Sequence, residues 1–242
     1  MAQETFNRMV RDTALTRARE TLNGASSHIR LLQIIDDAIE FSENLRQEMT
    51  EHEIDGLDDI DCQTGCAWCC YQQVGVTAPQ ALHIAKFLRT GNSSLTTEEA
   101  MSRLEAADKK LHGLDKIDRL AVAEPCVFLS KDNTCAIYAV RPFACRGANS
   151  IDAEFCRRLV EELNEVRGEL DNDGGRPWIH ALPFQSMAAL QDAILTATTE
   201  VGLSEEKLEL TAAVRIALAY PDAAQKWCDG EDIFVAARLK SI

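Results

Sequence analysis

The densest group of chemically reactive side chains in this sequence is the stretch CQTGCAWCC, which runs from Cys62 to Cys70. Thiolates are soft ligands that favour zinc, copper(I) and the iron of iron–sulfur clusters. The spacing Cys62-x3-Cys66-x2-Cys69 would let one short loop surround a metal centre from three sides. Cysteines that only fill a core would scatter along the chain. We therefore interpret this stretch as part of a metal site.

The adjacent pair Cys69-Cys70 poses a geometric problem for a single metal ion. Neighbouring side chains on an extended backbone point in divergent directions, so the pair is not expected to complete one small tetrahedron. One of the two thiols would ligate the first centre. The other would reach a second metal, cap a cluster or remain a reactive thiol.

The remaining cysteines supply candidates for the missing ligands. They are Cys126, Cys135, Cys145, Cys156 and Cys228. The first three are candidate ligands from elsewhere in the fold. Cys156 lies in a helical pattern and its role stays open, whereas Cys228 is expected to be a buried helix residue. Eight nearby cysteines would suit two four-thiolate sites, or one cluster with spare redox thiols.

One enzyme motif competes for the same residues. Cys62-x3-Cys66-x-Trp68-Cys69 resembles the CxxxCx(aromatic)C signature of radical SAM enzymes, in which three cysteines hold a 4Fe–4S cluster. Those enzymes place the motif after the first strand of a partial β/α barrel. Two long helical patterns precede it here and few strands are predicted, so radical SAM chemistry is only an alternative.

Two segments together resemble a known family, the YkgJ-like CxxCxxCC proteins, described as a zinc- or iron-chelating domain. The first segment is CQTGCAWCC, whose first gap has three residues where the family pattern has two. The second is PCVFLSKDNTCAIYAVRPFACR, from Pro125 to Arg146. Some larger proteins with this motif are flagellin lysine N-methylases, which use SAM and an iron–sulfur cluster, so the resemblance leaves enzymatic activity open.

The resemblance implies metal binding by a set of seven cysteines. The expected ligands are Cys62, Cys66, Cys69, Cys70, Cys126, Cys135 and Cys145. The cofactor is an iron–sulfur cluster, with 4Fe–4S preferred, or Zn²⁺ in a closed structural site. Redox, sensing and metal-handling roles all fit such a centre, as does a structural zinc module in an interaction protein.

Accessory groups near the cysteines are expected among the arginines, the aromatic residues and one histidine. Arg141 and Arg146 would either donate hydrogen bonds to thiolate sulfurs or pair with surface carboxylates, and Pro142 would begin a short helix. Trp68 and Tyr138 are expected to shield the site. His52, in the acidic stretch before Cys62, is the one histidine considered as a further ligand.

The composition of the chain argues against some classes of binding partner. The chain has 242 residues and a formal net charge of −14, and an acidic surface repels nucleic-acid phosphates. No apolar run approaches the roughly 18–20 residues that span a bilayer, and the N-terminus lacks the apolar core of a secretory signal. We therefore expect a cytoplasmic protein with reduced thiols and no nucleic-acid or membrane partner. Its protein or small-molecule partner and its oligomeric state are left open.

Apolar periodicity predicts a mostly α fold, with a helical body and a small irregular cysteine-rich module. That module contains one short β-hairpin, in CVFLSKDNTCAIY around the turn Asp132-Asn133. Thr77 and Thr96 are predicted helix N-caps. The helices are expected over 6–22, 29–49, 78–88, 97–111, 152–170, 180–200, 204–219 and 222–239. We expect one domain, 1–242, made of an N-terminal helical hairpin (1–55), a metal-binding module (62–156) and C-terminal helices (157–242).

Overall fold

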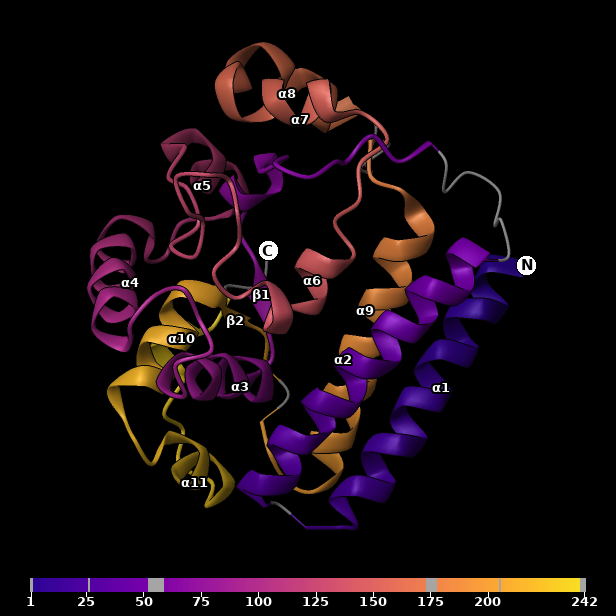
Figure 1. The fold of residues 1–242 in the computed structure, drawn as a ribbon, viewed down its shortest axis with the longest axis vertical. Coiled ribbons are helices and arrows are strands. Elements are labelled where there is room, and N and C mark those ends of the chain that lie inside the picture. Colours follow the sequence, from indigo (N-terminus) through magenta and orange to yellow (C-terminus); the bar gives the residue numbers. More distant parts are fainter. Residues whose placement is uncertain (1, 26, 52–58, 173–177, 205, 240–242) are drawn as a thin grey trace.

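The computed structural model of this chain describes residues 2–25, 27–51, 59–172, 178–204 and 206–239. It is mostly α-helical, as predicted (Figure 1). None of the helices in these ranges is long and apolar enough to cross a membrane. The helices are α1 (Ala2–Leu22), α2 (His28–Glu51), α3 (Ala78–Arg89), α4 (Thr97–Leu111), α5 (Lys116–Val122), α6 (Phe143–Arg146), α7 (Ala153–Glu161), α8 (Leu163–Asn172), α9 (Ala181–Glu200), α10 (Leu210–Ala219) and α11 (Ala223–Cys228).

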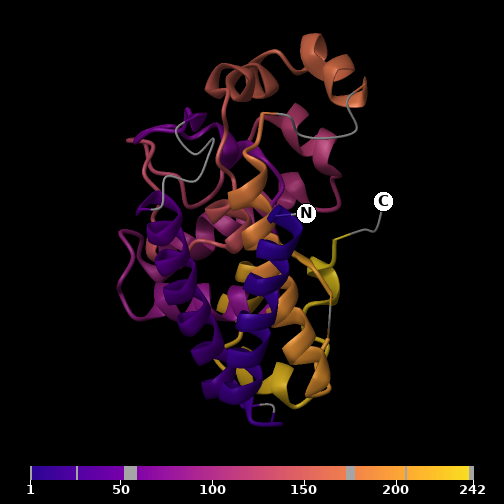
Figure 2. The same ribbon diagram turned by 90° about the vertical axis from the view of Figure 1, so that its right-hand side faces the viewer.

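Three long helices, α1, α2 and α9, run side by side along one flank of the molecule (Figures 1 and 2). The turn between α1 and α2 falls at Asn23-Gly24, as the sequence predicts. Both residues have positive φ, 48° and 71°, a backbone conformation that asparagine and glycine tolerate best. The chain therefore reverses there, and α2 packs back along α1.

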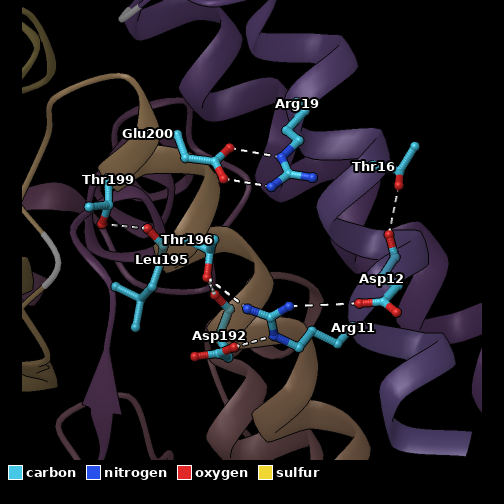
Figure 3. A network of polar contacts seen from close by, with 9 residues as sticks. All are labelled: Arg11, Asp12, Thr16, Arg19, Asp192, Leu195, Thr196, Thr199 and Glu200. Atoms are coloured by element: carbon cyan, nitrogen blue, oxygen red, sulfur yellow. Dashed lines mark hydrogen bonds and ion pairs between the residues drawn. The ribbon is translucent and has the colours of Figure 1, made fainter. Parts of the chain in front are cut away.

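Ion pairs fix how α1 lies on α9, although the two helices are far apart in the sequence (Figure 3). Arg19 donates two hydrogen bonds to Glu200, at 2.8 and 2.6 Å. Arg11 donates to Asp192 at 2.5 Å and to the Thr196 hydroxyl at 3.2 Å. Exposed pairs of this kind contribute about 0–1 kcal/mol each. Most of the stability must therefore come from the apolar residues buried between the helices.

The opposite flank consists of α3, α4, α10 and α11 (Figure 1). Both predicted N-caps are confirmed, because the hydroxyls of Thr77 and Thr96 accept the backbone N–H groups of Gln80 and Glu99. His83, on α3, reaches the Asp36 carboxylate on α2 at 2.7 Å. This half-buried contact joins the two flanks.

The β structure is smaller than the sequence suggests. Strands β1 (Gly75–Val76) and β2 (Leu208–Glu209) form an antiparallel pair in which Gly75 faces Glu209. The expected hairpin around Asp132-Asn133 does turn there, with Asn133 at φ 56°, but its pairing is a single bridge, Leu129 to Cys135. The hydroxyls of the turn residues Ser130 and Thr134 bond to each other at 2.7 Å and tighten it.

Three predicted helix ranges need correction. The range 152–170 is two helices, because α7 ends at Glu161 and α8 begins at Leu163. The range 204–219 is helical only from Leu210, since residues 208–209 are paired in β2. In the range 222–239 the α-helix ends at Cys228, and the 3₁₀ helix η4 (Val235–Ala237) follows later in the chain. Helix α5 was not predicted.

Gly147 allows α6, which carries Cys145, to lie directly on α9. A Cβ placed there would come within 3.0 Å of the Met187 Cβ and 3.1 Å of the Phe184 Cα, and backbone atoms cannot easily move aside. We expect Gly147→Ala to lower the free energy of unfolding by about 1–3 kcal/mol, the usual cost of overpacking. Urea denaturation measures this change.

Gly168→Ala is the matched control, because Gly168 lies within α8 and an added Cβ would meet nothing within 4 Å. Alanine at an open helical position should raise stability by up to about 1 kcal/mol. Equal effects of the two substitutions would contradict the close packing of α6 on α9.

Candidate metal centre

The first four cysteines lie on a tight loop that runs into the 3₁₀ helix η2 (Trp68–Tyr71). The Cys66 N–H donates to the Gln63 carbonyl at 3.0 Å, and the Cys70 N–H donates to the Ala67 carbonyl at 2.9 Å. Gly65 has φ 90°, so a side chain there would be strained. This glycine lets the chain turn between Cys62 and Cys66.

The vicinal pair is not on an extended backbone, so the premise of divergent side chains was wrong. Cys69 and Cys70 both belong to η2, and their thiols are hydrogen-bonded to each other. This contact, followed by burial, raises the pKa of Cys69 far above its usual range. The two side chains therefore point toward a common region.

The second half of the site is joined to the first through the backbone. The N–H of Cys126 donates to the Cys70 carbonyl at 2.8 Å. Cys135 follows the turn, one residue before the Ala136 N–H that donates to Phe128 at 2.8 Å. Cys145 lies on α6, which begins after Pro142 as predicted. Three segments distant in sequence thus converge on one end of the fold.

The thiols interact as two adjoining groups. We call Cys69, Cys126, Cys135 and Cys145 the Cys126 group. A negative charge on Cys145 or Cys135 would raise the pKa of Cys126. A negative charge on Cys69 would raise the pKa of both Cys135 and Cys145. We call Cys62, Cys66 and Cys156 the Cys62 group, whose members also interact with Cys69. Cys69 is therefore close to both groups. Within the part of the chain that the structure describes, no three His, Cys, Asp or Glu side chains are close enough to hold a metal ion.

Cys156, whose role the sequence left open, belongs to the site region. It lies on α7, is 5% exposed, and its thiol donates to the Ser150 hydroxyl at 3.2 Å. Cys228 is a buried residue of α11, as expected, and is not among the thiols that act on the two groups. The predicted contribution of His52 lies outside the described residues.

Sequence reasoning missed Ser150, which holds the Cys62 group together. Its backbone N–H donates to the Cys62 sulfur at 3.1 Å, and its carbonyl accepts the Asp61 N–H at 2.8 Å. The hydroxyl, buried with the rest of the residue, accepts from Cys156. Only the Ser150-x-Asp152 turn before a helix marks this position in the sequence, and that pattern says nothing of sulfur.

The two arginines have different roles. Arg146 pairs with Glu43 on α2 and donates to the carbonyls of Arg141 and Ala139 at 3.1 and 2.7 Å. It therefore holds the loop before α6 against α2. Of the two roles considered for this arginine, this is pairing with a carboxylate and not hydrogen bonding to sulfur. Arg141 instead lies beside the thiols: its guanidinium is 4.4 Å from the centroid of the Tyr138 ring, and its buried Nε has no hydrogen-bond partner.

The aromatic residues cover the site unequally. Trp68 packs against a small apolar cluster formed by Cys156, Leu159, Val166 and Trp178, so it shields the Cys62 group as expected. Tyr138 is 61% exposed. It supports Arg141 from the solvent side rather than closing the site.

Burial raises the pKa of several of these thiols further above the ordinary cysteine value of 9.0. It raises the pKa of Cys126 and of Cys145 to about 12, and that of Cys156 to about 11. The positive charge of Arg141 opposes this rise at Cys145. A metal ion must therefore displace protons from these thiols, and its affinity will rise with pH.

These pKa values predict that the metal-free protein loses stability in alkaline solution. Below pH 9.0 the thiols of Cys126 and Cys145 are protonated in both the folded and the unfolded chain. Between pH 9.0 and about 12 the unfolded chain loses their protons first, so the free energy of unfolding falls across this range. Urea denaturation with chelator and reductant present measures the fall. The Cys126→Ser, Cys145→Ser double variant should show a smaller fall, and an equal fall would contradict the assignment.

Residues 61–162 match the model of the CxxCxxCC family, described as "Putative zinc- or iron-chelating domain". The match includes both cysteine groups and ends in α7. No curated protein and no solved structure gives a match. The sulfur-rich donor set of the two groups agrees with the chelating role in that description. The match spans residues 61–162, less than half of the chain, so this segment is similar to the CxxCxxCC domain.

Proposed function

We propose that this protein binds a thiolate-coordinated metal centre, with an iron–sulfur cluster preferred to zinc, and that it uses the centre for electron transfer or redox sensing. The observation that carries the proposal is the convergence of three distant segments. They bring six of the seven predicted cysteines and Cys156 into two adjoining groups around Cys69, whose thiol is hydrogen-bonded to the seventh, Cys70. Sulfur-only donor sets favour zinc and iron–sulfur clusters. Among the described residues the thiols do not yet form a set that could hold a metal ion, so closing either group around a metal requires them to move closer together.

Hydrogen-bond donors next to the thiols support the preference for iron. The Ser150 N–H already donates to the Cys62 sulfur at 3.1 Å, and the buried Nε–H of Arg141 is unpaired. Donors to sulfur and nearby positive charge set the potential of iron–sulfur clusters. When bound, such a cluster supplies reversible one-electron transfer. The role of this chain is then to fix the sulfurs, to exclude water through Trp68 and to balance the negative charge through Arg141.

The test is to measure metal and acid-labile sulfide in protein purified without air, together with its visible spectrum. Iron with matching sulfide supports the proposal. Protein that carries neither iron nor zinc, and takes up neither in reconstitution, overturns it.

A structural zinc site is the second candidate, because the cysteines belong to several separate elements. The Cys126 group links η2, the turn before Cys135, and α6, while Cys156 brings in α7. A metal ion bound there would hold these elements together at this end of the fold. Tight, colourless, stoichiometric zinc without redox response would assign this function.

The enzymatic alternative receives no support from the fold. The strands of the described residues are β1 and β2, of two residues each, and not the alternating strands of a radical SAM barrel. Calorimetric titration of SAM into cluster-loaded protein tests the methylase alternative directly. Binding of SAM would revive it.

A further inference from the structure

Helices α7 and α8 have a small core of their own. They lie at the end of the molecule opposite α11 (Figure 1). Leu159 of α7 and Val166 of α8 are at most 2% exposed, and with two further residues they form a buried cluster distinct from the main core. The Arg158 guanidinium on α7 also pairs with the Glu169 carboxylate on α8 at 3.1 Å. Because the two helices are joined to each other in this way, we call them the α7–α8 unit.

The two chain segments that lead into and out of this unit are hydrogen-bonded to each other. The His180 N–H donates to the Asn149 carbonyl at 2.7 Å, and the Ile151 N–H donates to the Trp178 carbonyl at 2.8 Å. The Ser150 hydroxyl donates to the same Trp178 carbonyl at 2.8 Å. The chain therefore leaves for the α7–α8 unit and returns from it at one closed base, and this base can stay paired while the helices above it move.

The base is fixed to the segment that carries Cys62. The Asp61 N–H donates to the Ser150 carbonyl at 2.8 Å, and the Asp61 carboxylate accepts the Ala153 N–H at 2.9 Å. Beyond the base, α7 packs on η2 and on α5, and η2 contributes Trp68 to the small cluster. The Cys156 thiol of α7 donates to the Ser150 hydroxyl at 3.2 Å. The closed α7–α8 unit thus lies against the Cys62 group.

The two cores differ greatly in size. The small cluster has four buried residues, whereas the main core draws residues from α1, α2, α3, α4, α9, α10 and α11. The free energy needed to open part of a fold depends on the apolar surface that the part buries. Opening of the α7–α8 unit should therefore cost much less than unfolding of the whole chain.

We infer that α7 and α8 open as one unit while the main core stays folded, and that this opening is the route by which a metal ion reaches the Cys62 group. The entry route rests on the proposed function, whereas the opening itself does not. Opening breaks the bond between Cys156 and Ser150 and removes the apolar residues that pack on Trp68. The thiols of the Cys62 group then become accessible from solvent.

Amide hydrogen exchange of the metal-free protein tests the opening. In the wild type, the amides of α7 and α8 should exchange faster than those of α9. Val166→Ala leaves a cavity in the small cluster and should make exchange in α7 and α8 about 10-fold faster. Val214→Ala is the matched control, because Val214 is also 0% exposed but belongs to α10 and the main core. It should leave exchange in α7 and α8 unchanged.

The rate of zinc uptake tests the entry route. Metal-free protein is mixed with zinc held by a weak chromogenic chelator, and the transfer of zinc is followed with time. If entry requires the open unit, uptake should be about 10-fold faster in Val166→Ala, in proportion to its more frequent opening. Uptake by Val214→Ala should match that of the wild type.

The outcomes separate this inference from the function on which its second part rests. Equal exchange rates in α7, α8 and α9 of the wild type, a comparison that needs no variant, would overturn the inference, because these helices would then open only together. Faster exchange in Val166→Ala with unchanged zinc uptake would overturn the entry route. Wild-type protein that binds neither zinc nor iron would overturn the proposed function and the entry route with it, while the exchange rates would still decide whether the unit opens.

Discussion

The Cys69→Ser variant is expected to lose metal from both cysteine groups at once. The Cys69 thiol interacts with members of the Cys126 group and is also close to Cys156 of the Cys62 group. A serine hydroxyl is a poor replacement for a soft thiolate. We expect metal affinity to fall by more than about 100-fold, beyond the range for residues that only support a ligand. Elemental analysis and chelator competition measure the loss.

Two other cysteine variants show whether the loss of metal from both groups is specific to Cys69. Cys156→Ser should weaken metal binding at the Cys62 group alone, because Cys156 interacts with that group and Cys69. Cys228→Ser changes a buried cysteine of α11, outside residues 61–162, and should keep the full metal content. Full metal content in Cys69→Ser would show that the two groups do not share this residue.

Removal of the metal by a chelator is expected to lower the melting temperature by about 10 °C while most of the helix remains. A ligand present at about 1,000 times its dissociation constant stabilises the folded state by about 4 kcal/mol. In a chain of this size about 1 kcal/mol shifts the melting temperature by roughly 2–4 °C. The main core survives because it lies between long helices: Leu190 and Ile194 of α9 and Ala213 of α10 are at most 1% exposed.

Circular dichroism during heating measures both parts of this expectation. The Cys69→Ser variant is the control, and it should melt at the same temperature with and without chelator. Complete loss of helix on chelation at 25 °C would mean that the metal organises the whole fold. An unchanged melting temperature in the wild type would mean that the metal does not bind the folded state preferentially.

The long helices could be predicted because their signals are local. The hydroxyl of Thr77 needs only the residues immediately after it to cap α3, and the same holds for Thr96 and α4. The reversal at Asn23-Gly24 likewise follows from the backbone freedom of two residues. The cysteine clustering was visible for the same reason.

The features that could not be predicted depend on residues brought together from distant segments. Gly75 pairs with Glu209, and two such short strands have no periodicity to detect. Ser150 gains its role only where the fold places it beside Cys62. The same limit explains why Arg141 and Arg146, close in the sequence, could not be assigned to sulfur or to carboxylate in advance.

The pairing of α1 with α9 has a consequence for the order of events during synthesis. The segment that matches the CxxCxxCC model ends at residue 162, whereas α9 begins only at Ala181. At about 5–20 residues per second, the ribosome needs roughly 10–30 s to make the chain between α1 and its partner helix. During that time the apolar face of α1 has no α9 to pack against, since such distant contacts form late. Cys62 to Cys145 are synthesised in this interval, so the whole cysteine-rich segment exists before α9 completes the helical body.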